Sequence, residues 1–144
     1  MTSSIGQPLK RKEDPRLITG EARFLDDLTL PGLLHAAILR SPYAHARIKR
    51  IDTSKARAVP GVAAVFTGED FKDLPGMPIA WQVTGPKNYV NAPRVLEIDR
   101  VTHAGMGVAV VLAEDRYVAE DAMRLIEVDW EVLLDVVDAK SATE

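Results

Sequence analysis

The stretch Gly107 to Ala113 reads GVAVVLA, and it gives the clearest indication of fold in this sequence. It contains no polar side chain that could occupy a solvated face. A near-continuous apolar run of this length is typical of a β-strand that is buried on both faces. The stretch therefore predicts a buried strand in the last third of the chain.

A helix is expected directly after this strand. Glu114 and Asp115 stand where a helix that begins there needs negative charge, near its positive end. The apolar residues that share one helix face are Val118, Ala122, Leu125 and Ile126, at i, i+4, i+7 and i+8. Glu120 and Arg124 form a favourable i,i+4 pair on the other face. Residues 126–132 then alternate apolar and acidic side chains, which predicts that a strand follows the helix.

A second strand–helix–strand unit is expected upstream. In order, it consists of a strand over 46–51, a helix ending at Ala58, a turn at Pro60-Gly61 and a strand over 62–67. Asp52 and Thr53 can cap the helix, because their side-chain oxygens accept hydrogen bonds from the free amides of a first turn. Residues 46–51 alternate apolar and basic side chains, which predicts a half-buried strand with a solvated cationic face.

The remaining segments complete the expected layout. Leu33 to Leu39 is a short apolar run closed by Ser41-Pro42, which indicates a further buried strand. Residues 68–74 fit another turn of helix, and Pro75 to Pro93 is a long loop of the kind that is functional, disordered or ordered by a partner. Residues 1–16 are expected to form an extended arm and residues 17–144 the folded domain. Two strand–helix–strand units predict an α+β or α/β sandwich with one mixed sheet.

The composition fits one soluble globular domain. Of the 144 residues, 47% are hydrophobic and 27% are charged, and the formal net charge is −3. Because the sequence contains no cysteine, it cannot supply a thiolate zinc site or hold an iron–sulfur cluster. The 18 basic and 21 acidic residues are spread along the chain and create no positive field, so we expect no nucleic-acid partner.

Membrane and targeting segments are not expected either. The longest stretches free of charged residues, 74–86 and 101–113, are shorter than the roughly 20 residues of a membrane helix. Residues 1–16 contain neither the apolar core of a secretory signal nor a twin arginine. We therefore expect no membrane span and a cytoplasmic location.

The candidate catalytic and metal-binding residues do not lie in recognised sequence motifs. The histidines His35, His45 and His103 have no metal-ligand spacing, so that a site would have to be assembled in space. Asp26-Asp27 fits an exposed turn with a capping aspartate better than a metal-binding pair or an acid–base pair. Neither Ser41 nor Ser54 lies in the Gly-x-Ser-x-Gly turn that exposes a nucleophile.

Two loops are more distinctive. Gly105-Met106-Gly107 precedes a strand, whereas a dinucleotide-binding loop follows one, so it predicts a tight turn into the strand. Residues 40–46, Arg-Ser-Pro-Tyr-Ala-His-Ala, predict a rigid turn between two strands. Arg40 and His45 are expected to donate hydrogen bonds to neighbouring backbone or to a partner surface.

Several motifs in fixed order resemble one family. They are residues 19–27 (TGEARFLDD), Leu30-Pro31-Gly32, Leu34-His35-Ala36, residues 40–48 (RSPYAHARI), Ile51-Asp52, Pro60-Gly61-Val62 with Val65, and Ala113-Glu114. This series is similar to the start of the large, molybdopterin-binding subunit of the molybdenum hydroxylases: xanthine dehydrogenase, aldehyde oxidase and aerobic carbon monoxide dehydrogenase.

The resemblance implies an α+β fold, the α/β-hammerhead domain at the head of that subunit. It implies that molybdenum–molybdopterin, iron–sulfur clusters and FAD are bound elsewhere in the complex, and that this chain supplies no catalytic, cofactor-binding or metal-binding residue. The expected partners are the molybdopterin-binding remainder of the large subunit and the iron–sulfur and flavin subunits.

Two positions depart from the family pattern. Gly105-Met106-Gly107 stands where relatives carry Gly-Glu-Pro or Gly-Gln-Pro, and Leu134 stands where they carry proline. A split-gene subunit and a truncated fragment both fit these features. The alternatives are a free-standing binding or assembly module that has kept the hammerhead fold, and a small enzyme built around His35, His45, His103 and Asp27. The substrate, whether carbon monoxide, a purine, an aldehyde or an N-heterocycle, is not encoded in these residues.

Overall fold

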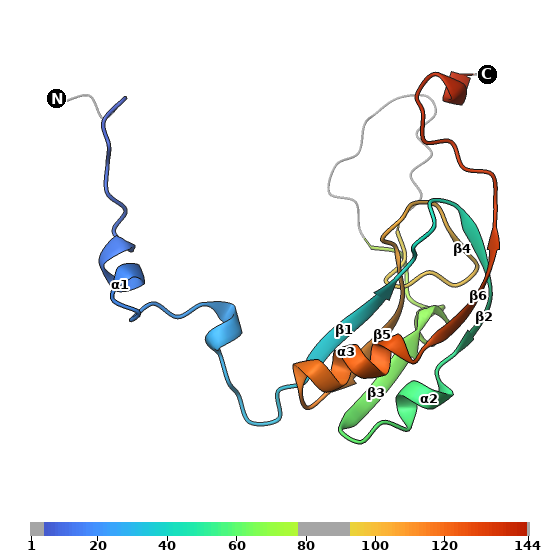
Figure 1. The fold of residues 1–144 in the computed structure, drawn as a ribbon, viewed down its shortest axis with the longest axis horizontal. Coiled ribbons are helices and arrows are strands. Elements are labelled where there is room, and N and C mark those ends of the chain that lie inside the picture. Colours follow the sequence, from blue (N-terminus) through green and yellow to red (C-terminus); the bar gives the residue numbers. More distant parts are fainter. Residues whose placement is uncertain (1–4, 78–92, 144) are drawn as a thin grey trace. The chain divides into compact units, whose positions relative to one another are not determined.

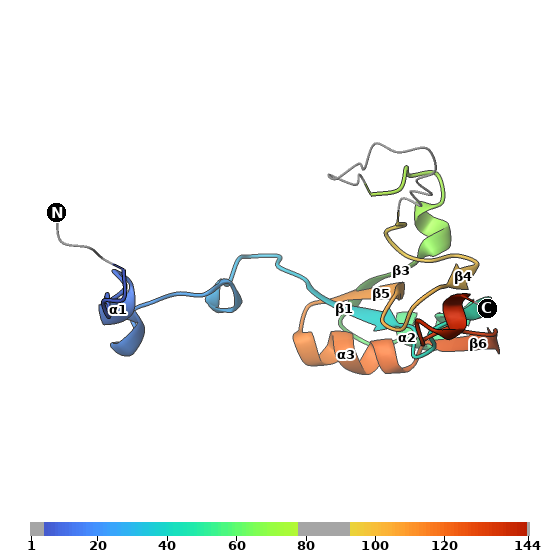
Figure 2. The same ribbon diagram turned by 90° about the horizontal axis from the view of Figure 1, so that it is seen from above.

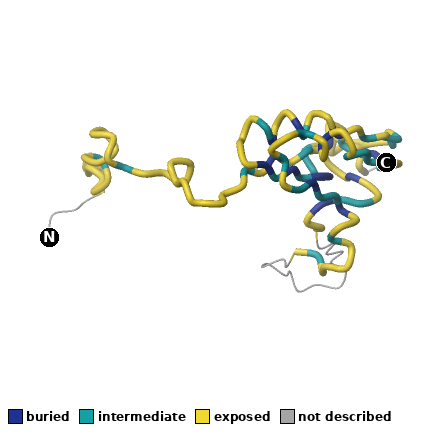
Figure 3. Tube along the Cα trace, turned by 90° about the horizontal axis from the view of Figure 1, so that it is seen from below, coloured by how far each residue is buried: buried dark blue, intermediate teal, exposed yellow. Residues whose placement is uncertain are grey.

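A computed structural model describes residues 5–77 and 93–143, and its chain divides into two compact units, Met1–Leu33 and Leu34–Glu144. The first unit contains the short helix α1 (Asp14–Ile18) and the 3-10 turn η1 (Leu25–Asp27). None of its described residues is buried, and Figure 3 shows exposed positions along nearly all of this segment. The expected division after residue 16 stays a prediction.

The second unit contains two three-stranded sheets (Figure 1). The first has the order β1-β5-β3 and is formed by β1 (His35–Arg40), β5 (Gly107–Ala113) and β3 (Val62–Thr67). The second has the order β4-β2-β6 and is formed by β4 (Arg100–Val101), β2 (Ala46–Asp52) and β6 (Glu127–Val132). The short turns η2 (Gly68–Phe71) and η3 (Ser141–Thr143) complete the described elements.

The α+β class is confirmed, but the single mixed sheet is wrong, because every described strand pair is antiparallel. Both strand–helix–strand units are present. The first runs from β2 through α2 (Ser54–Arg57) to β3, and the second from β5 through α3 (Arg116–Arg124) to β6. Each unit begins in one sheet and ends in the other, so its two strands never pair with each other.

The main core lies between β5 and the helices. Ala109, Val111 and Ala113 of β5 are fully buried, and Ala119 and Ala122 of α3 pack against them. These small helix residues let α3 approach the sheet closely. Figure 2 shows α3 along one side of the first sheet and η2 on the other side.

The helix differs from expectation at one residue. Leu125 was expected on the buried face, yet it is 42% exposed. The helix ends at Arg124 and Leu125 is its C-cap, so the helical spacing no longer applies there. Ala119, which the periodic set omitted, is buried instead.

A smaller cluster joins the two sheets. Its buried members are Ala46, Val101 and Val108, with Trp130 and Met106 packed against them. The ring of Tyr43 meets that of Trp130 edge to face at 5.7 Å. This cluster positions the turns described next.

Candidate functional site

A hydrogen-bonded clamp joins the turn after β1 to the loop before β5. The backbone N–H of Ser41 donates to the carbonyl of Met106 at 2.8 Å, and the N–H of Gly105 donates to the carbonyl of Ser41 at 2.8 Å. The guanidinium of Arg40 donates to the carbonyl of Gly105, also at 2.8 Å. Gly105 has a φ of +93°, which favours glycine. The turn between the two strands, the backbone role of Arg40 and the tight turn before β5 are therefore confirmed, and the rigidity of residues 40–46 stays a prediction.

His45 holds the chain that leaves β6. Its Nδ1 lies 2.6 Å from the carbonyl oxygen of Leu134, and the N–H of Leu133 donates to the carbonyl of His45 at 3.0 Å. A carbonyl oxygen can only accept, so Nδ1 carries the proton and Nε2 is left as an acceptor in the neutral ring. The expected donation by His45 to neighbouring backbone is thus confirmed.

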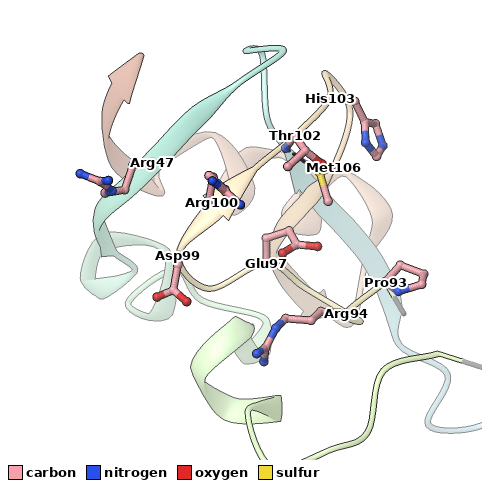
Figure 4. A pocket seen from close by; sticks show the side chains of 9 residues that line it. All are labelled: Arg47, Pro93, Arg94, Glu97, Asp99, Arg100, Thr102, His103 and Met106. Atoms are coloured by element: carbon pink, nitrogen blue, oxygen red, sulfur yellow. Dashed lines mark hydrogen bonds between the residues drawn. The ribbon is translucent and has the colours of Figure 1, made fainter. Parts of the chain in front are cut away.

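An open hollow of about 620 Å³ lies beside this clamp (Figure 4). Its lining residues are Arg47, Pro93, Arg94, Glu97, Asp99, Arg100, Thr102, His103 and Met106. Figure 4 shows Arg47 on the far side from His103, with Glu97 and Met106 between them. Three arginines and two acidic residues are among its lining, so the hollow has no single sign of charge.

Glu97 and Met106 are the most distinctive groups in this hollow. Burial raises the pKa of Glu97, and the charges of Arg94 and His103 partly offset this rise. The sulfur of Met106 accepts from the backbone N–H of Thr102 at 3.1 Å. The amide of Thr102 thus has a hydrogen-bond partner in the side chain of Met106.

The three candidate histidines do not form one site. His45 and His103 line a second hollow, of about 720 Å³, between the turn after β1, the loop after β4 and residues 134–137. His35 is at the opposite end of β1, about 17 Å along the strand from Arg40. Within residues 5–77 and 93–143, no group of three or more His, Asp or Glu side chains is placed to hold a metal ion.

The other polar candidates have local structural roles. Asp27 accepts from the N–H of Phe24 at 2.8 Å and closes the exposed turn η1, which confirms the capping aspartate. Ser41 is buried and its hydroxyl bonds both backbone groups of Tyr43. Ser54 donates to Asp52 at 2.6 Å, and the two hydrogen bonds from Ser54 are the main cause that lowers the pKa of Asp52.

The basic face of β2 is paired with β6. The cross-strand ion pairs are Arg47–Glu131 at 3.0 Å, Arg50–Asp129 at 2.9 Å, Lys49–Glu131 at 3.7 Å and, from the start of α2, Lys55–Glu127. All these side chains are exposed, so water and salt screen each pair and it stabilises the fold only weakly. The face expected to be only solvated is therefore also neutralised by the acidic residues of β6.

Several residues that line the first hollow could not be identified from the sequence. Arg94, Glu97 and Asp99 follow the proline-rich loop, where no periodicity or motif marks a role. Residues 78–92 of that loop lie outside the described part of the chain. The contact between Met106 and Thr102 was also missed, because methionine sulfur is a weak acceptor that no spacing rule predicts.

Sequence comparison places this arrangement among known proteins. The family profile described as "Aldehyde oxidase and xanthine dehydrogenase, a/b hammerhead domain" matches residues 19–134. The carbon monoxide dehydrogenase large chain of Afipia carboxidovorans is 46% identical over 97% of this chain and 17% of its own length. The xanthine dehydrogenase molybdenum-binding subunit of Escherichia coli O157:H7 is 40% identical over 81% of this chain and 16% of its own length.

Structural comparison agrees. Quinoline 2-oxidoreductase from Pseudomonas putida 86 matches with a TM-score of 0.84 and 43% identity, over 100% of this chain and 18% of that one. Reconstituted CO dehydrogenase from Oligotropha carboxidovorans matches with a TM-score of 0.81 and 45% identity, over 95% of this chain and 16% of that one. The chain thus spans less than a fifth of these relatives. It belongs to the aldehyde oxidase and xanthine dehydrogenase α/β-hammerhead family and matches one part of the large subunits of molybdenum hydroxylases.

Proposed function

We propose that this chain is a non-catalytic hammerhead piece of a molybdenum hydroxylase, which scaffolds the molybdopterin-binding polypeptide within an oxidoreductase complex. The observation that carries the proposal is the extent of the match. Nearly the whole chain aligns with a carbon monoxide dehydrogenase large chain, yet it covers 17% of that protein. The chemistry of such an enzyme is then carried by the polypeptide that these residues do not match.

The described residues do not fit the molybdenum–molybdopterin group that the family implies. A pterin phosphate needs several converging donors, such as a helix N-terminus or clustered basic side chains. Around the first hollow the arginines are interleaved with Glu97 and Asp99, and Arg47 is already paired with Glu131. We therefore assign the cofactor to the remainder of the large subunit and derive no step through it here.

The proposed partners are that remainder together with iron–sulfur and flavin subunits, and the proposed location is the cytoplasm. The subunit names of relatives support a multi-chain complex, for example "6-hydroxypseudooxynicotine dehydrogenase complex subunit gamma" from Paenarthrobacter nicotinovorans, which is 42% identical to this chain. Among the residues that the structure describes, no helix is long and apolar enough to cross a membrane.

Affinity purification of the tagged chain from its host tests the proposal. The eluate is assayed for molybdenum, iron, flavin and co-purifying polypeptides, with the tag alone as control. Recovery of metal with a larger molybdopterin-binding chain is the expected result. A metal-free protein without such a chain would overturn the proposal and favour a free-standing binding module.

A further inference from the structure

The first sheet has one face that neither α2 nor α3 covers, and the short turn η2 lies on that side. Cross-strand register places six apolar residues on it in two rows, Ala36–Leu112–Ala64 and Ile38–Val110–Phe66, and we call this set the open face. All six are half-buried or exposed, and Ile38 is 42% exposed. On the opposite face, which α3 covers, Val111 and Ala113 are fully buried.

The open face is built like a protein interior. It contains no polar side chain, and β5 carries apolar residues on both sides, a pattern typical of strands that are covered twice. One end is already closed by Leu96, which is 5% exposed and lies 3.2 Å from the position of a Cβ at Gly107. At the β3 side, Phe71 packs against Phe66 with ring centroids 5.7 Å apart. Among the described residues of the second unit, no α-helix covers the middle of this face.

We propose that a helix of the molybdopterin-binding remainder of the large subunit packs on this open face, with an apolar stripe of small and aliphatic side chains. The proposal rests on the proposed function. Three strands span about 10 Å, which is about the diameter of one helix. The helix α3 shows the same packing on the other side of the sheet, through Ala119 and Ala122.

The size of the face decides against an independent partner. Two rows of three residues cover on the order of 100–200 Å², whereas a stable complex buries about 800 Å² on each partner. A second copy of this chain therefore cannot be held by the open face alone. A helix from a much longer polypeptide can, because that polypeptide makes further contacts elsewhere, and the matched relatives are more than five times as long as their aligned part.

Photo-cross-linking tests this inference, and because this chain contains no cysteine, a single introduced cysteine can be labelled specifically in the isolated chain. Ala36→Cys on the open face and the matched control Asp121→Cys on the exposed side of α3 are each labelled with benzophenone maleimide in the isolated chain, which is then combined with the rest of the large subunit. We expect Ala36→Cys to cross-link to one helical segment of that polypeptide, and to react with maleimide at least tenfold more slowly in the complex than alone. The control is expected to do neither.

Other results would overturn the proposal in distinguishable ways. A cross-linked dimer of this chain would show that a second copy covers the face, and a cross-link to residues 5–33 would show that the chain covers it itself. Unprotected Ala36→Cys in a complex that still forms would refute the helix and leave the proposed function intact. Failure of the unlabelled wild-type chain to co-purify at all would refute the proposed function as well. As a second variant, Leu112→Lys is expected to keep its circular dichroism spectrum and to lose co-purification at least tenfold, while Tyr117→Lys keeps both.

Discussion

Gly68 is a residue at which the backbone of η2 closely approaches residues 97 and 98. It is buried, and a Cβ there would lie 2.5 Å from the carbonyl oxygen of Glu97 and 2.7 Å from Ile98 Cγ1. The nearest atom belongs to the backbone, which cannot turn aside as the end of a side chain can. The glycine is therefore required for close approach, not for an unusual backbone angle.

Substitution of this glycine should destabilise the fold. We expect Gly68→Ala to lower the free energy of unfolding by about 1–3 kcal/mol, the usual cost of overpacking, as measured by urea denaturation. Gly107→Ala is the matched control, because its Cβ would meet the end of the Leu96 side chain at 3.2 Å. A loss under about 1 kcal/mol is expected there. Equal losses in the two variants would contradict this reasoning.

Glu97 makes stability depend on pH. Burial raises its pKa in the folded protein above the unfolded value, so the folded state holds this proton more tightly. The corresponding stability is complete below the unfolded pKa and is lost as the pH rises through the folded pKa. Glu97→Gln should therefore gain stability relative to wild type between acidic and neutral pH, measured by thermal unfolding across that range. A difference in melting temperature between the two proteins that stays the same at every pH would contradict a raised pKa for Glu97.

At the scale of elements, α3 depends on its N-cap. The carboxylate of Asp115 accepts from the N–H groups of Tyr117 at 2.8 Å and Val118 at 3.4 Å. Loss of such a cap typically costs about 1 kcal/mol. We expect Asp115→Ala to lower the melting temperature by roughly 2–8 °C. Asp121→Ala, which removes an exposed pair with Arg124, should cost under about 0.5 kcal/mol, and a larger effect there would be unexpected.

The elements also show how far the sequence predicts this fold. Strands and helices followed from local spacing, as GVAVVLA and the acidic alternation of β6 illustrate. Strand pairing did not follow, because no local pattern states that Ala46 meets Val132 while Val62 meets Ala113. The first hollow was missed for the same reason: Glu97 acquires its environment from packing, not from a motif. The family was accessible from sequence because its motifs retain a fixed order.

At the scale of the whole molecule, the first unit carries no buried residue among those described. Its removal should therefore leave the second unit folded. We expect deletion of residues 1–33 to change the melting temperature by less than about 2 °C, measured by circular dichroism. A fall of more than about 5 °C would mean that this segment contributes more than roughly 1 kcal/mol to the fold.

The two strands of each strand–helix–strand unit lie in different sheets, and this has a consequence for folding during synthesis. Because β1 pairs with β5 and β2 with β6, His35 can pair only after Ala113 has been synthesised, and Ala46 can pair with Val132 only after Val132 has been synthesised. The first sheet can close once β5 has been made, because β1 and β3 precede β5 in the chain, whereas the second sheet is complete only with β6. At about 5–20 residues per second, β6 follows β5 by roughly one to four seconds of synthesis. Each sheet is therefore completed late relative to its first strand, and the first sheet can close before the second.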